Sequence, residues 1–350
     1  MSYRHSNRPL SSRSRSGGLR QQGAALVIAL LIFAVCAGLM VAMQRQFTIF
    51  YQRGSNLFLG EQSQSYLRGA EDLASLALVL DYDQDKQREQ PRDDLTEIWA
   101  QEATPYPLEE GGWLMGSLED LQGRFNLNSL SAPARDNAST NRPRFTPSQV
   151  QFIRLLQALE ENALGEQEAI ALTEAIADWL DVDTQARFNG AEDDFYFGRT
   201  PAYRSANRPF ASVSELRALA TMTEPLYQAL APLVTVWPQQ PQTLNIHTAP
   251  PTLLRTINAN DDLTPLTVTE GQALVLKRQE QGFVDVEDLL SDPVFADRAL
   301  DDVGNLLGTS SGYFLLSAQV EIAGRQARLY SVLQRRSRQV TSLVRASGSL

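Results

Sequence analysis

One uncharged segment near the N-terminus limits what this chain can fold into. Residues 24–43 are 20 residues without a charged side chain, the length that a helix needs to cross the hydrocarbon core of a bilayer. The preceding residues 1–23 carry five arginines and no acidic residue, which favours a cytoplasmic leader under the positive-inside rule. We therefore expect one membrane-spanning segment, with the rest of the chain on the other side of the membrane.

The helical pattern continues beyond the apolar segment. Apolar residues recur at helical spacing from Gln44 to Leu80, and no proline lies between Pro9 and Pro91. We predict one helix over about residues 24–80. A helix of about 55 residues is roughly 80 Å long, more than twice the apolar thickness of a bilayer. Its second half is therefore expected to pack on a soluble domain.

Composition excludes several classes of function. The net charge is −10, and a chain that began at Ala24 would carry −15, which opposes non-specific binding to nucleic acid. The single cysteine, Cys36, lies in the apolar segment, so no intramolecular disulfide can form. The two histidines, His5 and His247, are far apart, which leaves little basis for a Ser–His–Asp triad or a histidine-based zinc site. We expect no enzymatic activity.

The N-terminal pattern as a whole resembles the signal of type IV pilins and type II secretion pseudopilins. In that family a prepilin peptidase cuts after the glycine that precedes the apolar helix, which here means between Gly23 and Ala24, and the helix is retained. An ordinary single-span anchor fits the stretch from 24 to 80 equally well. One departure is informative, because Ile28 stands where the family usually has Glu. Among pseudopilins, that loss is typical of minor pseudopilin K.

The order of predicted elements indicates an α+β protein. A long N-terminal helix, strands near 111–130, a large helical block and closing strands match a pilin-like fold, a long N-terminal helix packed on an antiparallel sheet, with a large inserted α-helical domain. This order again resembles minor pseudopilin K. The expected boundaries are 1–23 for the basic leader, 24–43 for the transmembrane half of the helix, 44–130 for the rest of the helix and the first strands, 131–240 for the inserted domain, 241–310 for a second small helical module, 311–336 for a closing β-hairpin with its turn at Ala323-Gly324, and 337–350 for a loose tail.

The densest cluster of acidic residues follows a predicted helix end. Its members are Asp181, Asp183, Glu192, Asp193 and Asp194. Crowded carboxylates and hard oxygen donors suit calcium, but Gln185 and Ala186 stand where an EF-hand loop needs Asp or Asn and then Gly. From spacing alone, a calcium site and an exposed acidic loop remain equally open. A similar run, Asp81, Asp83 and Asp85, is predicted to be a solvated helix end.

Further segments strengthen the resemblance to minor pseudopilin K from Gly23 to about Tyr330. They are Asp178-Trp179, Asp181–Asp183, Gly190-Ala191-Glu192-Asp193, Tyr196, Pro201–Tyr203, Asn207–Pro209, "GRFNLNSL" and "LNIHTAPPTLL", with His247 where Asn is usual. That family binds structural calcium in its helical domain. The resemblance therefore implies calcium ligands among Asp181, Asp183, Glu192, Asp193 and Asp194.

The resemblance also implies a function. A minor pseudopilin of this kind is a non-enzymatic, single-pass protein of the inner membrane with its body in the periplasm. It is expected to cap the pseudopilus tip with the minor pseudopilins I and J, supporting protein export across the outer membrane, after processing by prepilin peptidase.

Two other functions remain alternatives. One is a membrane-anchored protein that binds DNA through a helix-hairpin-helix at 271–290, which Asp285, Glu287 and Asp288 disfavour. The other is a metal-dependent hydrolase built on the acidic cluster, which lacks an evident His or Lys base.

Overall fold

The computed structural model describes residues 20–88, 90–102, 104–109, 111–131, 145–219, 221–260 and 262–348. The chain forms two units, Met1–Gln62 and Ser63–Leu350. The predicted leader residues 1–19 lie outside the described residues. The described part of the first unit belongs to one long helix, α1 (Arg20–Asp85), whose C-terminal third belongs to the second unit. The prediction of one unbroken helix is confirmed, with ends a few residues beyond those expected.

The first unit has the features of a membrane anchor. Large apolar side chains from Leu26 to Met43 are more than half exposed, so no protein core covers them. Within the part of the chain that the structure describes, α1 is the one helix long and apolar enough to cross a membrane. Both observations are consistent with a single-pass anchor.

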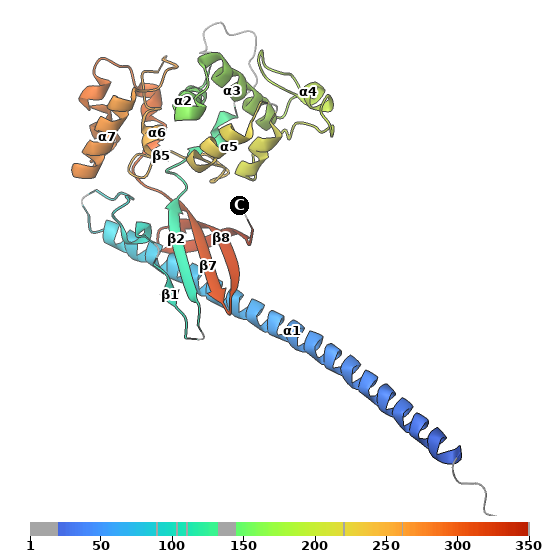
Figure 1. Ribbon diagram of the computed structural model, residues 1–350. Coiled ribbons are helices and arrows are strands. Elements are labelled where there is room, and N and C mark those ends of the chain that lie inside the picture. The colour runs from blue at the N-terminus through green and yellow to red at the C-terminus, as the bar shows by residue number, and fades with distance from the viewer. Residues whose placement is uncertain are drawn as a thin grey trace, which may run out of the picture. The chain divides into compact units, whose positions relative to one another are not determined.

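The second unit is built on a five-stranded antiparallel sheet (Figure 1). Its strand order is β1 (Tyr106–Pro107), β2 (Trp113–Asp120), β7 (Tyr313–Ile322), β8 (Arg325–Arg336) and β9 (Gln339–Ala346). A 3₁₀ turn, η1 (Ile98–Ala100), lies between α1 and β1. The predicted α+β class is confirmed.

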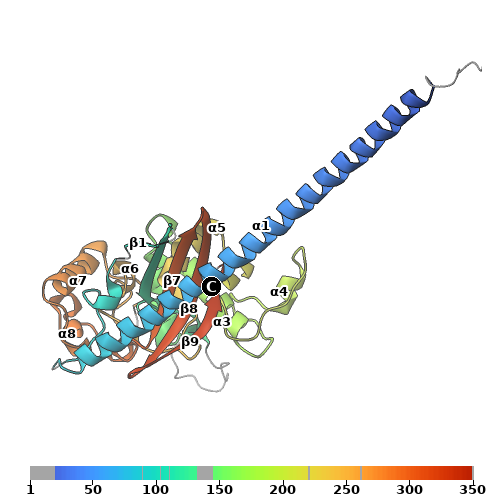
Figure 2. The same cartoon turned by 90° about the horizontal axis from the view of Figure 1, so that it is seen from below.

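The C-terminal part of α1 packs across one face of this sheet (Figure 2). The helix buries residues spaced three or four apart, among them Leu67, Ala74 and Leu78, which is one helical face. On β7 the residues alternate between buried and half-buried, as expected for a strand that is covered on one side. Glu71 of α1 also accepts hydrogen bonds from the guanidinium of Arg345 on β9 (2.6 and 2.8 Å), and these hydrogen bonds lower the pKa of Glu71.

The predicted closing hairpin is present, but the predicted loose tail is wrong. Ala323 and Gly324 both have positive φ and join β7 to β8, as a two-residue hairpin turn requires. The chain then turns back at Ser337, and Gln339–Ala346 form β9 against β8. Residues of β9 alternate between exposed and half-buried. Polar residues at 339, 341, 342 and 345 separate its apolar ones, so the segment lacks the apolar run that usually indicates a strand.

A helical domain is inserted between β2 and β7, and it gathers at one end of the sheet (Figure 1). Its helices are α2 (Pro147–Gln157), α3 (Glu166–Leu180), α4 (Asp193–Phe197), α5 (Glu224–Leu230), α6 (Pro251–Leu254), α7 (Val268–Glu280), α8 (Val286–Leu290) and α9 (Asp301–Gly304). Shorter 3₁₀ turns are η2 (Leu127–Leu130), η3 (Glu160–Asn162), η4 (Val213–Ala218), η5 (Ala231–Leu233) and η6 (Pro293–Phe295). Two parallel two-stranded ladders pair β3 (Phe125–Asn126) with β4 (Val234–Thr235) and β5 (Leu244–Asn245) with β6 (Leu307–Gly308).

The inserted domain begins earlier than predicted, and it shares one hydrophobic core with the predicted second helical module. Phe125 and Leu127, expected near the end of the first pilin-like strands, belong to the hydrophobic core of the inserted domain. That core continues without a break to Leu307, across the predicted boundary at 240. The parallel ladder of β3 with β4 explains the difference, because it ties residues 125–126 to the inserted domain instead of to the sheet.

The inserted domain is attached at the end of the sheet beside the C-terminal end of α1. Asp120, at the end of β2, is buried and accepts hydrogen bonds from Ser311 (2.6 Å), Thr248 (2.5 Å) and Asn245 (3.1 Å). At the same end, Arg335 of β8 donates to Asp81 of α1 (2.7 Å). The prediction that Asp81 and Asp85 are solvated is therefore wrong, since they are 1% and 6% exposed. The turn after α1 folds back and covers them.

Removal of β9 is expected to destabilise the body. A chain that ends at Arg338 loses the β8–β9 ladder and the ion pair of Arg345 with Glu71. We expect its thermal midpoint, measured by circular dichroism on the detergent-solubilised chain, to fall by roughly 5 °C or more. The matched control ends at Ser347 and keeps the strand. Equal midpoints for the two truncations would show that β9 contributes nothing.

Candidate metal centre

The acidic cluster lies in the loop between α3 and α4 of the inserted domain. Helix α3 stops at Asp181, whose backbone N–H still donates to Ala177 (3.1 Å). The loop then returns so that Glu192 precedes the first turn of α4. One carboxylate oxygen from each of Asp181, Asp183 and Glu192 lies within 4.8 Å of the other two. Three of the five predicted ligands are thus brought together.

Asp193 and Asp194 do not join this group of three. Oδ1 of Asp193 accepts hydrogen bonds from the backbone N–H (3.1 Å) and the hydroxyl (3.0 Å) of Ser205. The side chain of Asp194 is exposed to solvent. Both residues are in the first turn of α4, where a negative charge interacts favourably with the helix dipole. Their positions are explained without a metal.

Several oxygen atoms at the acidic group have no hydrogen-bond partner among the described residues. They are Oδ1 of Asp181, Oε1 of Glu192 and Oδ1 of Asn207. Asp181 and Glu192 are only 8% and 4% exposed. The amide of Asn207 lies beside the group, because its Nδ2 donates to the carbonyl of Asp183 (3.0 Å). Buried acceptors without donors are costly, and a cation would satisfy them.

Arg187 holds the loop in place from within. Its Nη1 donates to Asp181 (2.6 Å) and to the fully buried Asp178, and its backbone N–H donates to Asp178 as well (3.0 Å). A side chain at Gly190 would place Cβ only 1.8 Å from Asp178 Oδ2, so this close approach requires glycine. Asp178 therefore stabilises the loop. The glycine at position 190 is explained by steric exclusion, because a larger residue would collide with Asp178.

The electrostatics of the group favour a bound cation. Burial raises the pKa of Glu192 to about 6, a hydrogen bond from Ser205 opposes this shift, and nearby carboxylates add to it. Burial also raises the pKa of Asp181, which the hydrogen bond from Arg187 opposes. The three unpaired atoms of Asp181, Glu192 and Asn207 are carboxylate or amide oxygens, the ligand atoms that calcium prefers. The residues present fit a calcium ion.

Asn207 and Arg187 were not predicted to take part in this site. Asn207 lies fifteen residues beyond Glu192 along the chain, so no local spacing joins it to the acidic run. Its positive φ of 46° indicates a turn that brings the chain back to the loop. The Asn207–Pro209 segment was recognised only as a resemblance.

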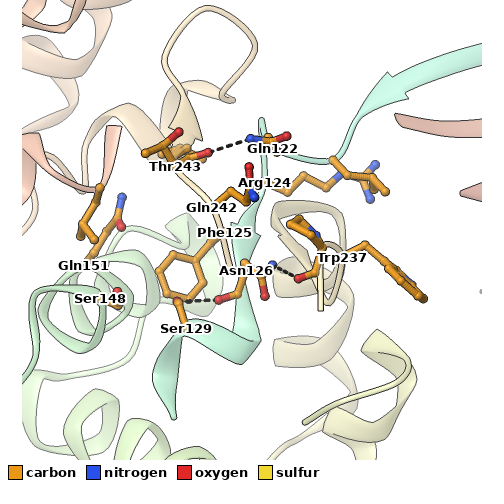
Figure 3. Close-up of a pocket in the computed structure, with 14 residues that line it drawn as sticks. Gln122, Arg124, Phe125, Asn126, Ser129, Ser148, Gln151, Trp237, Gln242 and Thr243 are labelled. Carbon is orange, nitrogen blue, oxygen red and sulfur yellow. Dashed lines mark hydrogen bonds between the residues drawn. The ribbon is translucent and has the colours of Figure 1, made fainter. Parts of the chain in front are cut away.

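The other candidate sites show structural roles. A pocket near the base of the inserted domain is lined largely by polar side chains (Figure 3). Of these, Gln122 donates to Thr243 (3.3 Å), Asn126 to the carbonyl of Pro238 (2.7 Å) and Ser129 to the carbonyl of Asn126 (2.6 Å) (Figure 3). These groups fix the backbone around β3.

In the helix-hairpin-helix segment formed by α7 and α8, Lys277 and Arg278 already bind other groups of the inserted domain. Lys277 pairs with Asp288 (3.6 Å) and Asp292 (3.3 Å). Arg278 donates to the carbonyls of Ile246 (3.1 Å) and Ala249 (2.6 Å). Phosphate binding would require these groups to break existing contacts, which disfavours the DNA-binding alternative.

His247 has no features of a catalytic base. It is 3% exposed, and burial lowers its pKa to about 4, so it stays neutral. Its backbone N–H donates to the side chain of Asn245 (3.0 Å), and its ring centroid lies 6.3 Å from that of Phe283. The imidazole packs within the inserted domain.

Known proteins resemble the chain over most of its length. Two family models described as type II secretion system protein K match residues 123–239 and 244–310. "Type II secretion system protein K" of Aeromonas hydrophila is 33% identical over 90% of this chain and 93% of its own. The protein of the same name from Pseudomonas aeruginosa is 34% identical over 90% and 89%.

A solved structure resembles the chain as well. It is a chain of the GspK-GspI-GspJ complex from the type 2 secretion system of enterotoxigenic Escherichia coli, with a TM-score of 0.70 and 26% identity. The match covers 85% of this chain and 100% of the solved one.

Proposed function

This chain belongs to the type II secretion system protein K family, and we propose that it caps the pseudopilus tip and thereby supports protein export across the outer membrane. The family is one of structural minor pseudopilins, and our proposal gives this chain an assembly role without catalysis. Residues 24–43 anchor it in the inner membrane with a single pass. The body lies in the periplasm, because the arginine-rich leader favours the cytoplasmic side.

The attachment point of the inserted domain is the main support for the proposed tip position. The domain leaves the sheet at the end where α1 terminates, which is remote along the helix from the membrane segment. A subunit stacked beyond this end would meet the bulk of the inserted domain.

Ile28 supports the same position. In the family, a Glu at this place is thought to pair with the N-terminal amine of a neighbouring subunit, and Ile28 cannot accept that pairing. An ammonium group left unpaired in an apolar environment is strongly unfavourable. A subunit that lacks the Glu is therefore suited to the end of a filament.

Cleavage after Gly23 by prepilin peptidase is the first test of this assignment. We expect intact mass measurements of the membrane-extracted chain to show a start at Ala24 when the peptidase is co-expressed and at Met1 without it. Substitution of Gly23 by Leu should block cleavage, while Gly38→Leu, later in the same helix, should not. A start at Met1 in both cells would leave an ordinary anchor.

The outer face of α1 offers a surface for the partners. Leu73, Leu76 and Leu80 follow one another at helical spacing and are 64%, 52% and 45% exposed. This face of the helix lies opposite the one that buries Leu67 and Leu78 against the sheet. Burying an exposed leucine stabilises a complex by roughly 1.5–3 kcal/mol. We assign this leucine stripe to contact with the minor pseudopilins I and J.

A charged residue in the leucine stripe should prevent assembly. We expect Leu76→Asp to reduce co-purification with minor pseudopilins I and J by at least tenfold, because a carboxylate would be buried in the contact. Leu276→Asp on α7 is the matched control, since Leu276 is 56% exposed. Equal co-purification of both variants with the partners would exclude the stripe as the contact.

Calcium in the inserted domain is part of the proposed function. Asp181, Asp183 and Glu192 would hold the ion, with Asn207 as a further oxygen donor. When bound, it neutralises the crowded carboxylates and ties the loop between α3 and α4 to the return segment at 205–207. Its role is structural.

Removal of one ligand should abolish the effect of calcium on stability. With calcium at about 100 times its dissociation constant, binding adds about 2.7 kcal/mol to the unfolding free energy. We expect the thermal midpoint of the full chain in detergent to rise by about 5 °C or more over its value in EDTA. Asp183→Ala should remove this rise, because it removes one of the three carboxylates that would hold the ion. The variant should still fold, because the Asp183 side chain is half-buried and joins no ion pair that the structure describes.

The matched control for the metal site is Asp194→Ala. Asp194 lies in the same segment but is exposed and outside the group of three carboxylates. It should keep the full response to calcium. Loss of the response in Asp194→Ala but not in Asp183→Ala would contradict the ligand set.

A further inference from the structure

A second acidic cluster is buried at the C-terminal end of α1. It consists of Asp81 and Asp85 of the helix and Asp93 and Glu97 of the segment that follows, and we name it the helix-end cluster. One oxygen from each of the four carboxyl groups lies within 4.8 Å of the others. Their exposed fractions are between 1% and 6%. It is separate from the candidate metal centre of the inserted domain.

Two guanidinium groups face the helix-end cluster. Arg335 donates to Asp81 (2.7 Å) and to Asp93. Arg88 donates to Glu97 (2.7 Å) and lies 3.0 Å from an oxygen of Asp85. Four carboxyl groups therefore share two cations, which leaves two negative charges unbalanced if all four are ionised.

The charged groups around the cluster do not remove this excess. Asp94 is already paired with Arg92 (3.0 Å). Asp120, at the end of β2, adds another buried carboxyl group that interacts with Asp93. The surroundings are therefore more negative than the cluster alone, and buried like charges at this distance repel strongly.

The closeness of the carboxyl groups indicates how the charge is relieved. One oxygen of Asp81 and one of Glu97 lie within 4.8 Å of each other, and both side chains are buried. Two buried carboxylates this close repel each other, and a proton bound to one of them relieves the repulsion. We propose that Glu97 keeps a proton at neutral pH and thereby acts as a pH-sensitive latch between α1 and residues 93–97.

The direction of the titration agrees with this latch. Burial raises the pKa of Glu97 to about 8, although the hydrogen bond from Trp99 opposes the shift. Burial raises the pKa of Asp85 to about 6, with further contributions from Asp81 and Asp93. Because the pKa of Glu97 is higher in the folded state, its protonation stabilises the fold, and this contribution is fully present below the ordinary pKa of 4.5. The contribution to the unfolding free energy is lost as the pH rises through about 8.

A proton fits the helix-end cluster better than a metal ion does. The guanidinium groups of Arg335 and Arg88 already contact carboxyl oxygens of the cluster. A divalent cation among them would be repelled by both. Glu97 also accepts hydrogen bonds from Trp99 (2.8 Å) and the backbone of Asp94 (3.1 Å), which hold it beside Asp81.

The latch reaches the base of the inserted domain. The backbone N–H of Asp93 donates to Thr309 (3.0 Å), and its carbonyl accepts from Asn245 (2.9 Å). Its carboxylate accepts from the backbone of Ser311 (2.7 Å). Residues 93–97 thus connect α1 to the point where the inserted domain meets the sheet. Loss of the proton weakens a contact shared by all three parts.

Thermal unfolding between pH 6 and pH 9 tests the latch. The full chain is measured in detergent with EDTA, so that bound metal does not contribute. We expect the wild-type midpoint to fall by about 4 °C or more over this range. Glu97→Gln, a neutral mimic of the protonated acid, should lose most of that fall. The matched control is Glu109→Gln at an exposed glutamate, which should retain it.

Infrared spectroscopy gives a second measurement that does not depend on the variant folding. We expect wild-type protein to show the carbonyl stretch of a protonated carboxyl group at pH 7 and to lose it by pH 9. Glu97→Gln, if folded, should lack the band at pH 7. Absence of the band from wild type at pH 7, or an equal fall in midpoint for wild type and Glu97→Gln, would overturn the proposal.

Discussion

The guanidinium of Arg335 joins parts of the body that are far apart in sequence. From β8 it pairs with Asp81 of α1 and Asp93 of the following segment, and it donates to the carbonyl of Ser311 (3.0 Å) before β7. It also lies over the ring of Phe314, 5.0 Å from its centroid. Loss of one partner from a buried ion pair costs roughly 3–5 kcal/mol, because the other charge is left unpaired. The pilin-like part and the inserted domain therefore depend on one residue.

Features that depend on local signals could be predicted from the sequence. The long helix followed from an apolar run and helical spacing, and the turn at Ala323-Gly324 followed from its position between two strands. The strand Gln339–Ala346 could not be predicted, because its pairing with β8 and the ion pair of Arg345 with Glu71 are long-range. The boundary of the inserted domain was misplaced for the same reason, since only tertiary packing assigns Phe125 to its core.

The two acidic runs show why a short motif does not determine its environment. Asp81 and Asp181 both begin an Asp-x-Asp sequence at the end of a helix. At Asp81 the charge is met by an arginine 254 residues away in sequence. At Asp181 an arginine of the same loop satisfies one oxygen and leaves the other without a donor. Spacing alone left the candidate metal centre open, and it could not identify Asn207, which only the returning chain brings near.

The position of the inserted domain has a consequence for how the chain folds. Asp120 and Ser311 are hydrogen-bonded although 191 residues separate them, and β2 and β7 pair directly beside this contact. Closing so long a loop of unfolded chain carries a large entropic cost and slows folding. The inserted domain has its own continuous core, and once folded it holds both of its ends at neighbouring strands. The domain can then act as a template for the sheet, so that its folding determines when the pilin-like part becomes complete.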